Sequence, residues 1–316
     1  MTDIANSSKK SVYAALVGNS LVALTKIGAA FWTGSAAMMS EAIHSAVDTA
    51  NEILLLYGYH RAGRPPDRMH PLGYGRELYF WSFIVALLIF ALGAGVSIYQ
   101  GAMRILAPQA IEQPLVNFIV LGLSFIFEGT TWLIALRSVR SESRQVGWYK
   151  AFLRSKDPPA YMVLFEDSAA LIGIVIAAAA IGAATLLEQP IWDGVGSVLI
   201  GLLLAATSML LARETQSLLI GEPAHPALTE SILEIAGKTP GVLRANGVLT
   251  TQMSPSQVVA AVSIEFADDK RADDIEETVI AIENRVREEH PIVQALFIKP
   301  QTRGRYKQRS REFGLR

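Results

Sequence analysis

The chain has 316 residues, of which 51% are hydrophobic and only 18% are charged, and its formal net charge is −1. Soluble domains usually carry about 25% charged residues, so this composition, with a mean hydropathy of +0.32, favours a membrane protein. The absence of cysteine excludes disulfides and thiolate metal sites, and the near-neutral charge argues against nucleic acid as a partner.

Residues 1–10 are polar and lack the order of a cleaved signal peptide, so we expect a short cytoplasmic N-terminal segment there. Beyond it, six apolar stretches reach the roughly 20 residues that a helix needs to cross a bilayer. They are Ser11–Trp32, Ser35–Tyr59, Tyr79–Met103, Leu115–Leu136, Tyr161–Leu187 and Ile191–Ala212. These stretches predict an α-helical membrane domain with six transmembrane helices over residues 11–213.

Basic residues are distributed unevenly over the connections between these spans. They precede the first span and follow the second and the fourth, whereas the opposite connections hold little positive charge beyond Arg104. The connection after the fourth span carries Arg137, Arg140, Arg144, Lys150, Arg154 and Lys156. By the positive-inside rule, both termini face the cytoplasm. Since no targeting extension is visible, we expect a multi-pass protein of a bacterial inner membrane, with the membrane of an organelle as the alternative.

The second span carries a histidine and an aspartate four residues apart, His44 and Asp48. This spacing places both side chains on one helical face, one turn apart, where an imidazole and a carboxylate can form half of a tetrahedral site for a divalent metal. Ionisable groups at membrane depth are costly, so the pair indicates either a function or a buried hydrogen bond that holds the bundle together. We favour metal binding.

The connection after the second span contains Asp67 and His70, three residues apart. These two residues are close enough in sequence to bind one metal ion, so they are candidates for a secondary loop site. Taken alone this pattern is weak, because aspartate and histidine are common in loops.

Three further acids lie in apolar spans. Glu166 and Asp167 of the fifth span are adjacent, so their side chains point about 100° apart and cannot both face one partner. One of them could complete a site with the second span, while the other pairs with a basic residue such as Lys26. Lys26 could instead snorkel to the surface, so we do not assign it to the site. For Glu128 of the fourth span, a metal ligand, a proton carrier and a polar helix contact all stay open.

Residues 214–300 are soluble in composition and predict a second domain. We expect a helix over Pro226–Lys238, strands over Val242–Thr250, Val258–Phe266 and Val293–Lys299, and a helix beginning at Asp273. This αββαβ order suits a small cytoplasmic α+β domain of the ferredoxin-like kind, with its helices on one face of the sheet. Its core is modest, so pairing with a second copy would stabilise it. Residues 301–316 are basic, and we expect a disordered tail.

Taken together, these features resemble the cation diffusion facilitators, a family of divalent-metal/proton antiporters. The stretches that carry the likeness are Gly34–Asp48, His70–Arg76, Asp193–Gly201 and Leu218–Glu222. Phe165–Ala170 and Phe127–Gly129 look most like the subgroup of the ninth zinc transporter. The resemblance implies a homodimer in which each protomer passes a divalent ion outward from the cytoplasmic side in exchange for protons.

The resemblance also implies that His44, Asp48 and Asp167 bind the transported ion. The family usually has another ligand four residues before the last one, and Val163, which cannot bind a metal, stands there in this chain. A side chain or water then supplies the fourth ligand, or the site is open. The candidates for a fourth ligand or proton carrier are Glu166, Glu128 and Asn51. Histidine with carboxylates suits zinc, manganese, iron or cobalt, and the subgroup favours zinc; no resident cofactor is expected.

Two other functions fit the same residues. An intramembrane metal-dependent hydrolase would use the three ligands to hold an activating metal with an open coordination position, although no HExxH-type pair or nucleophile is visible. A non-transporting membrane scaffold would dimerise through the soluble domain. We expect a transporter rather than an enzyme, with divalent metal ions, protons, the lipid bilayer and a second copy of the chain as its partners.

Overall fold

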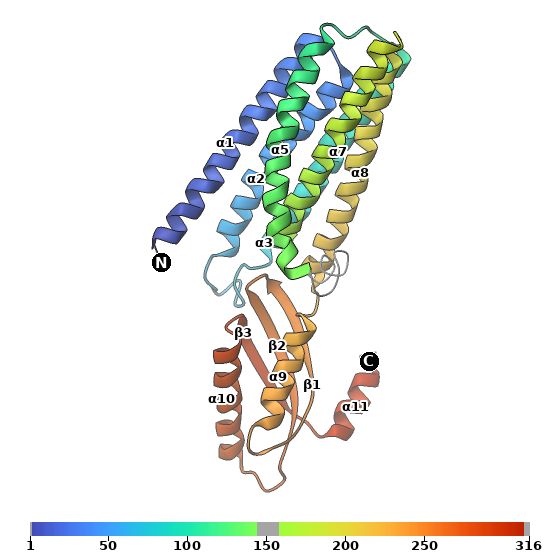
Figure 1. Cartoon of the computed structure of the whole chain (residues 1–316). Helices are drawn as coiled ribbons and strands as arrows, with labels where there is room; N and C mark the ends of the chain where they lie inside the picture. The colour runs from blue at the N-terminus through green and yellow to red at the C-terminus, as the bar shows by residue number, and fades with distance from the viewer. Residues whose placement is uncertain (1, 144–157, 313–316) are drawn as a thin grey trace. The chain divides into compact units, whose positions relative to one another are not determined.

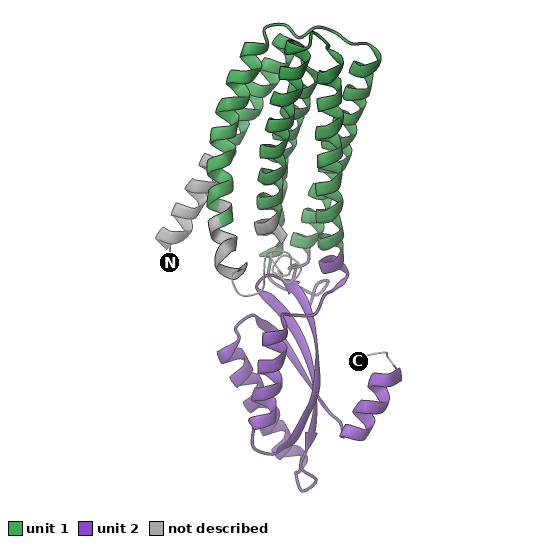
Figure 2. Ribbon diagram, turned by 45° about the vertical axis from the view of Figure 1, so that its right-hand side comes forward, with its two compact units in different colours: residues 1–64, 77–216 green, residues 65–76, 217–316 purple. Residues whose placement is uncertain are grey.

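The computed structural model describes residues 2–143 and 158–312 and divides into two compact units (Figure 2). Unit 1 comprises Met1–Arg64 and Glu77–Gln216, and unit 2 comprises Pro65–Arg76 and Ser217–Arg316. Arg144, Lys150, Arg154 and Lys156, on which part of the expected orientation depends, lie outside the described residues.

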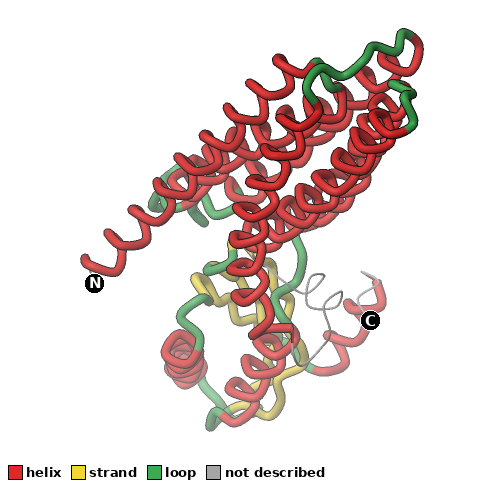
Figure 3. The backbone as a smooth tube through the Cα atoms, turned by 45° about the horizontal axis from the view of Figure 1, so that its top comes forward, coloured by secondary structure: helices red, strands yellow, loops and turns green. Residues whose placement is uncertain are grey.

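Unit 1 is a bundle of long helices that run side by side (Figures 1 and 3). In chain order these are α1 (Thr2–Thr33), α2 (Ala36–Ala62), α3 (Glu77–Leu88), a short π-helix η1 (Ile89–Ala94), α4 (Gly95–Leu106), α5 (Pro114–Ser143), α7 (Pro158–Leu186) and α8 (Ile191–Ile220). Because η1 joins α3 to α4 without a break, residues 77–106 form one continuous helical segment.

Four helical segments of the described residues are long and apolar enough to cross a membrane. They are Glu77–Leu106, Pro114–Ile134, Met162–Leu186 and Ile191–Ile220. The helix α2 is not among them, and its sequence carries the carboxylates Glu41, Asp48 and Glu52. These four segments confirm a helical membrane architecture. They do not by themselves establish the expected six spans.

The N-terminus of α2 is fixed by an aspartate at the start of α8. Asp193 is fully buried, and its Oδ1 accepts hydrogen bonds from the Ser35 hydroxyl at 2.6 Å and the Ala37 N–H at 3.1 Å. Its Oδ2 accepts from the Ala36 N–H at 2.6 Å and pairs with Arg104 Nε at 3.2 Å. The first N–H groups of a helix lack intrahelical partners and favour negative charge. Asp193 therefore links the start of α2 to α4 and α8.

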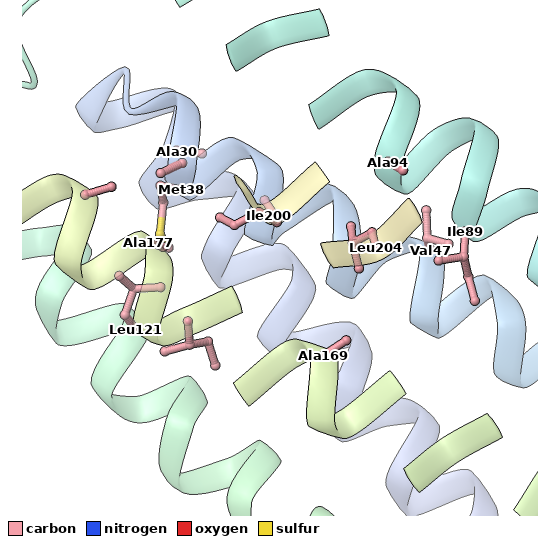
Figure 4. Packing of buried hydrophobic residues seen from close by; sticks show 14 of the residues in the cluster. Ala30, Met38, Val47, Ile89, Ala94, Leu121, Ala169, Ala177, Ile200 and Leu204 are labelled. Carbon is pink, nitrogen blue, oxygen red and sulfur yellow. The ribbon is translucent and has the colours of Figure 1, made fainter. Parts of the chain in front are cut away.

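Small apolar side chains let the helices of unit 1 approach one another closely. The buried cluster contains several alanines together with larger aliphatic residues, and Figure 4 shows part of it. The labelled residues are Ala30, Met38, Val47, Ile89, Ala94, Leu121, Ala169, Ala177, Ile200 and Leu204. Small residues at such contacts are the usual means of packing helices in membranes, where lipid is as apolar as the side chains.

Gly101 of α4 lies at a very close crossing with α8. A Cβ at this position would come 2.7 Å from the Gly194 carbonyl oxygen and 2.7 Å from the Val198 backbone nitrogen. We expect Gly101→Ala to destabilise the protein by about 1–3 kcal/mol through overpacking, measured as a lower melting temperature in detergent. Gly28→Ala is the matched control, because in the described part of the chain no atom beyond the adjoining backbone of its own helix lies within 4 Å of its added Cβ. Equal melting temperatures for the two variants would contradict the close crossing.

Unit 2 contains the small α+β domain expected from the sequence, in the order αββαβ. Its elements are α9 (Pro226–Lys238), β1 (Val242–Ser254), β2 (Gln257–Phe266), α10 (Ala272–Glu289) and β3 (Val293–Pro300). The sheet order is β1-β2-β3, with β1 antiparallel and β3 parallel to β2. Alternate residues of β2 from Val258 to Phe266 share a core with Ile232 of α9 and Ile282 of α10, so both helices cover one face (Figure 2).

The C-terminal segment is helical where its composition led us to expect disorder. The helix α11 (Arg303–Glu312) follows β3, and the Tyr306 N–H donates to the Thr302 carbonyl at 3.0 Å. The ring of Tyr306 lies against Gly247 of β1, where a Cβ would collide with it. This contact of Tyr306 with β1 supports the helix, and it cannot be inferred from the basic composition of the segment. Residues 313–316 lie outside the described part of the chain.

Candidate metal centre

A polar cavity of about 30 Å³ lies inside unit 1, between four helices. Its lining residues are Asn19 and Val22 of α1, Ser45 and Asp48 of α2, Glu128 and Thr131 of α5, and Asp167 and Ala170 of α7. A polar space of this size can hold one water molecule or an ion of similar size. Carboxylates from three separate helices thus meet at one place inside the bundle.

His44 and Asp48 lie next to each other on α2. His44 is only 1% exposed, and its Nδ1 is 3.2 Å from Asp48 Oδ1. Apart from this contact with each other, neither ring nitrogen of His44 nor Asp48 Oδ1 has a polar partner among the described residues. Buried polar atoms nearly always have such a partner, so these atoms are available for a ligand. Asp48 lines the cavity. His44 does not line it but contacts Asp48, so the histidine lies one side chain away from the cavity.

The adjacent carboxylates of α7 face different partners. Glu166 is buried, and its Oε1 accepts a hydrogen bond from Asn51 Nδ2 at 3.2 Å. Asp167 instead lines the cavity, and its Oδ2 has no hydrogen-bond partner within the described residues. Val163, one turn earlier on the same helix, is 39% exposed. The structure therefore brings Asp167 to the cavity that Asp48 lines and keeps Glu166 with Asn51.

Lys26 of α1 is fully buried, so it does not snorkel to the surface, and its carboxylate partners are Glu41 and Glu128 rather than an acid of α7. Its Nζ donates to Glu41 Oε2 at 3.1 Å, to the Ser45 hydroxyl at 2.9 Å and to Glu128 Oε1 at 2.7 Å. The lysine thus ties α1 to α2 and α5. We missed this role because pairing between helices cannot be read from spacing within one helix. The available signal was the occurrence of Lys26 and both glutamates in apolar spans.

The helices α1 and α2 are joined by a second polar contact next to the cavity. Asn19 Nδ2 donates to Glu52 Oε1 at 2.7 Å. Asn19 itself lines the cavity, although no sequence pattern places it near the candidate ligands. A single polar residue on an apolar helix is not specific enough to predict such a contact.

The candidate ligands are too far apart in this structure to bind one metal ion together. No group of three histidine, aspartate or glutamate side chains within the described residues is close enough together to hold a metal ion. Asp48, Glu128 and Asp167 nevertheless line the same cavity. Joint binding of one ion by these side chains therefore requires that they, or the helices that carry them, move closer together.

The Asp67–His70 pair belongs to unit 2 and is separate from this cavity. Asp67 Oδ2 accepts from the Tyr74 hydroxyl at 2.7 Å, and Oδ1 accepts from the N–H groups of Met69 at 2.9 Å and His70 at 2.7 Å. The Tyr74 hydroxyl, followed by the backbone of His70, lowers the pKa of the Asp67 carboxyl. His70 Nδ1 is 3.6 Å from Asp67 Oδ1. Asp67 thus already serves to fix the turn of this loop.

The sequence of the helical unit matches a known family. Residues 12–220 match the family model described as the cation efflux transmembrane domain. The chain therefore belongs to the cation efflux family, also called the cation diffusion facilitators. With the long apolar helices of unit 1, this membership makes the chain an integral membrane protein.

Individual relatives show similarity over much of this chain. A proton-coupled zinc antiporter, SLC30A9, mitochondrial, from Xenopus laevis is 37% identical over 259 residues, which are 81% of this chain and 46% of that protein. Metal tolerance protein C4 from Arabidopsis thaliana is 37% identical over 217 residues, which are 68% of this chain and 47% of that protein. The chain thus spans about half the length of these curated relatives. A solved MamM CTD chain is 19% identical, with a TM-score of 0.23, over 24% of this chain and 90% of that chain.

Proposed function

We propose that this chain transports divalent metal ions across a membrane in exchange for protons, with zinc as the favoured ion. The observation that carries the proposal is the polar cavity inside the bundle, which Asp48 of α2 and Asp167 of α7 both line, with His44 beside Asp48. Membership of the cation efflux family supports transport. The description of one relative as a proton-coupled zinc antiporter supports both the ion and the exchange.

The proposed transport site consists of His44, Asp48 and Asp167. These side chains bind a metal only when the imidazole is neutral and the carboxylates are ionised, so metal entry releases protons and protonation releases metal. A bundle that rocks between inward- and outward-open forms would let both ions use this one site. Manganese, iron and cobalt are further candidate ions, because imidazole and carboxylate ligands suit them too.

The transporter is proposed to be a homodimer with six transmembrane helices. Besides the four long apolar segments, these would include α1 with 32 residues and α2 with 27 residues, which are long enough to span a bilayer. The basic connections support cytoplasmic termini. We propose a bacterial inner membrane as its location. Since the zinc antiporters it resembles are described as mitochondrial, microscopy of a tagged protein should decide between the two membranes.

Proteoliposomes with a pH gradient and an interior zinc dye test the proposal. Wild-type protein should give zinc flux with counter-flow of protons, and His44→Ala or Asp48→Ala should abolish both, because each removes a proposed ligand. The control is His60→Ala, an exposed histidine of the same helix, which should retain the flux. Zinc flux that survives both substitutions would contradict the site.

The same preparation separates the alternative functions. Absence of flux for zinc, manganese, iron and cobalt in wild-type protein would favour the scaffold. Hydrolysis of a lipid or peptide substrate would favour the intramembrane hydrolase. The relatives described above are an antiporter and a metal tolerance protein, so they give the hydrolase no support.

A further inference from the structure

The ammonium group of Lys26 is saturated by its three acceptors. A lysine side chain has three N–H donors, and Nζ lies 3.1 Å or less from one oxygen each of Glu41, Ser45 and Glu128. Lys26 is also the only lysine or arginine among the buried side chains of the described residues. Its positive charge pairs directly with two carboxylates inside the bundle, those of Glu41 and Glu128.

Glu128 is shared between this lysine and the cavity. Its Oε1 pairs with Lys26 at 2.7 Å, whereas its Oε2 has no hydrogen-bond partner in the described part of the chain. The residue is 9% exposed and lines the cavity together with Asp48 and Asp167. Without the lysine, Glu128 would be a third free carboxylate at that place. Glu41, the other glutamate bound by Lys26, does not line the cavity.

We propose that Lys26 determines the metal preference of the transport site by holding Glu128 as its counter-ion, which neutralises the carboxylate and makes its free Oε2 a poor metal ligand. With Glu128 held, the ligands are one imidazole and two carboxylates, a set that suits zinc. With Glu128 released, the set gains a third carboxylate, and carboxylates suit manganese. This inference rests on the proposed function, because it assumes the site formed by His44, Asp48 and Asp167. Lys26 is a positioning residue, since it acts on the metal through Glu128.

Two double variants with the same charge test this role. Lys26→Met with Glu41→Gln frees Glu128, whereas Lys26→Met with Glu128→Gln removes it, and both remove one positive and one negative charge. Zinc and manganese dissociation constants are measured by competition with a fluorescent metal indicator on purified full-length protein in detergent. We expect the first variant to shift the ratio of the two constants towards manganese by about 10–100-fold, the range typical of residues that support metal ligands. The second should keep the wild-type ratio.

The single variant Lys26→Met should show the same shift as the variant that frees Glu128, although it leaves two unpaired buried glutamates and can fail to fold. If the single variant does not fold, the two double variants of equal charge still test the proposal. A ratio that is equal in both double variants would overturn the role of Lys26, as would a shift confined to the variant that lacks Glu128. If wild-type protein binds neither metal, the proposed site fails, and the assumption of this inference fails with it. Binding with the expected shift but without flux would contradict only transport.

Discussion

Replacing Asp167 by asparagine is expected to weaken zinc binding by at least about 10–100-fold, the loss that even a residue next to a metal ligand can cause. Asparagine keeps the size of the side chain but removes the charge that faces the cavity. Glu166→Gln is the matched control on the same helix, because the Glu166 carboxylate accepts from Asn51 and does not line the cavity. Its effect on zinc affinity should be much smaller.

Calorimetric zinc titration of the two purified variants measures this difference directly. The comparison tests whether Asp167, rather than its neighbour Glu166, is the ligand that α7 contributes. If Glu166→Gln weakened zinc binding as strongly as Asp167→Asn, the assignment of Asp167 alone as the ligand of α7 would be contradicted. Melting temperatures of both variants should be recorded with and without zinc, since a ligand that binds only the folded protein raises the melting temperature.

Replacing Asp193 by alanine is expected to destabilise the protein by about 3–5 kcal/mol, the usual cost of removing one partner from a buried ion pair. The substitution leaves the N–H groups of Ala36 and Ala37 and the Arg104 side chain without their acceptor. The melting temperature in detergent should fall by roughly 10 °C, given the few degrees per kcal/mol typical of proteins of this size.

Two further variants divide this effect into its parts. Arg104→Met removes the ion pair and a hydrogen bond to Gln109 but leaves the contacts of Asp193 with α2, so its melting temperature should lie between those of wild type and Asp193→Ala. Asp193→Asn keeps one acceptor oxygen but offers an amide to the remaining donors, and it should also be intermediate. A melting temperature of Asp193→Ala within the error of wild type would show that α2 does not depend on this cap.

Local patterns predicted the elements of the structure well. The helix expected over Pro226–Lys238 has these same bounds, and β2 begins one residue before the predicted Val258. Periodicity and end signals are properties of neighbouring residues, so one sequence contains them. Strand β1 runs on to Ser254, beyond the predicted end at Thr250, and its pairing with β2 contains register shifts that no local pattern announces.

Contacts between distant segments were beyond such reasoning. Asp193 and α2 are far apart in the sequence, and nothing near either of them indicates that one caps the other. The pairing of Lys26 with Glu128 depends on how α1 and α5 are rotated about their axes. The resemblance to a family suggested which residues bind metal, but it could not say that a buried lysine holds one of the candidate ligands.

Pro65–Arg76 belongs to unit 2, although in the sequence it lies between α2 and α3 of unit 1. The backbone passes between the two units three times, at residues 64–65, 76–77 and 216–217. In unit 2, Gly75 of this segment lies against Met253 and Ser254, and a Cβ would come 3.0 Å from the Met253 carbonyl oxygen. A protein truncated after Gln216 would therefore still contain residues 65–76 of unit 2, without the residues against which they pack. A rotation of unit 2 would also pull on the ends of α2 and α3, because the backbone joins residues 65–76 to both helices.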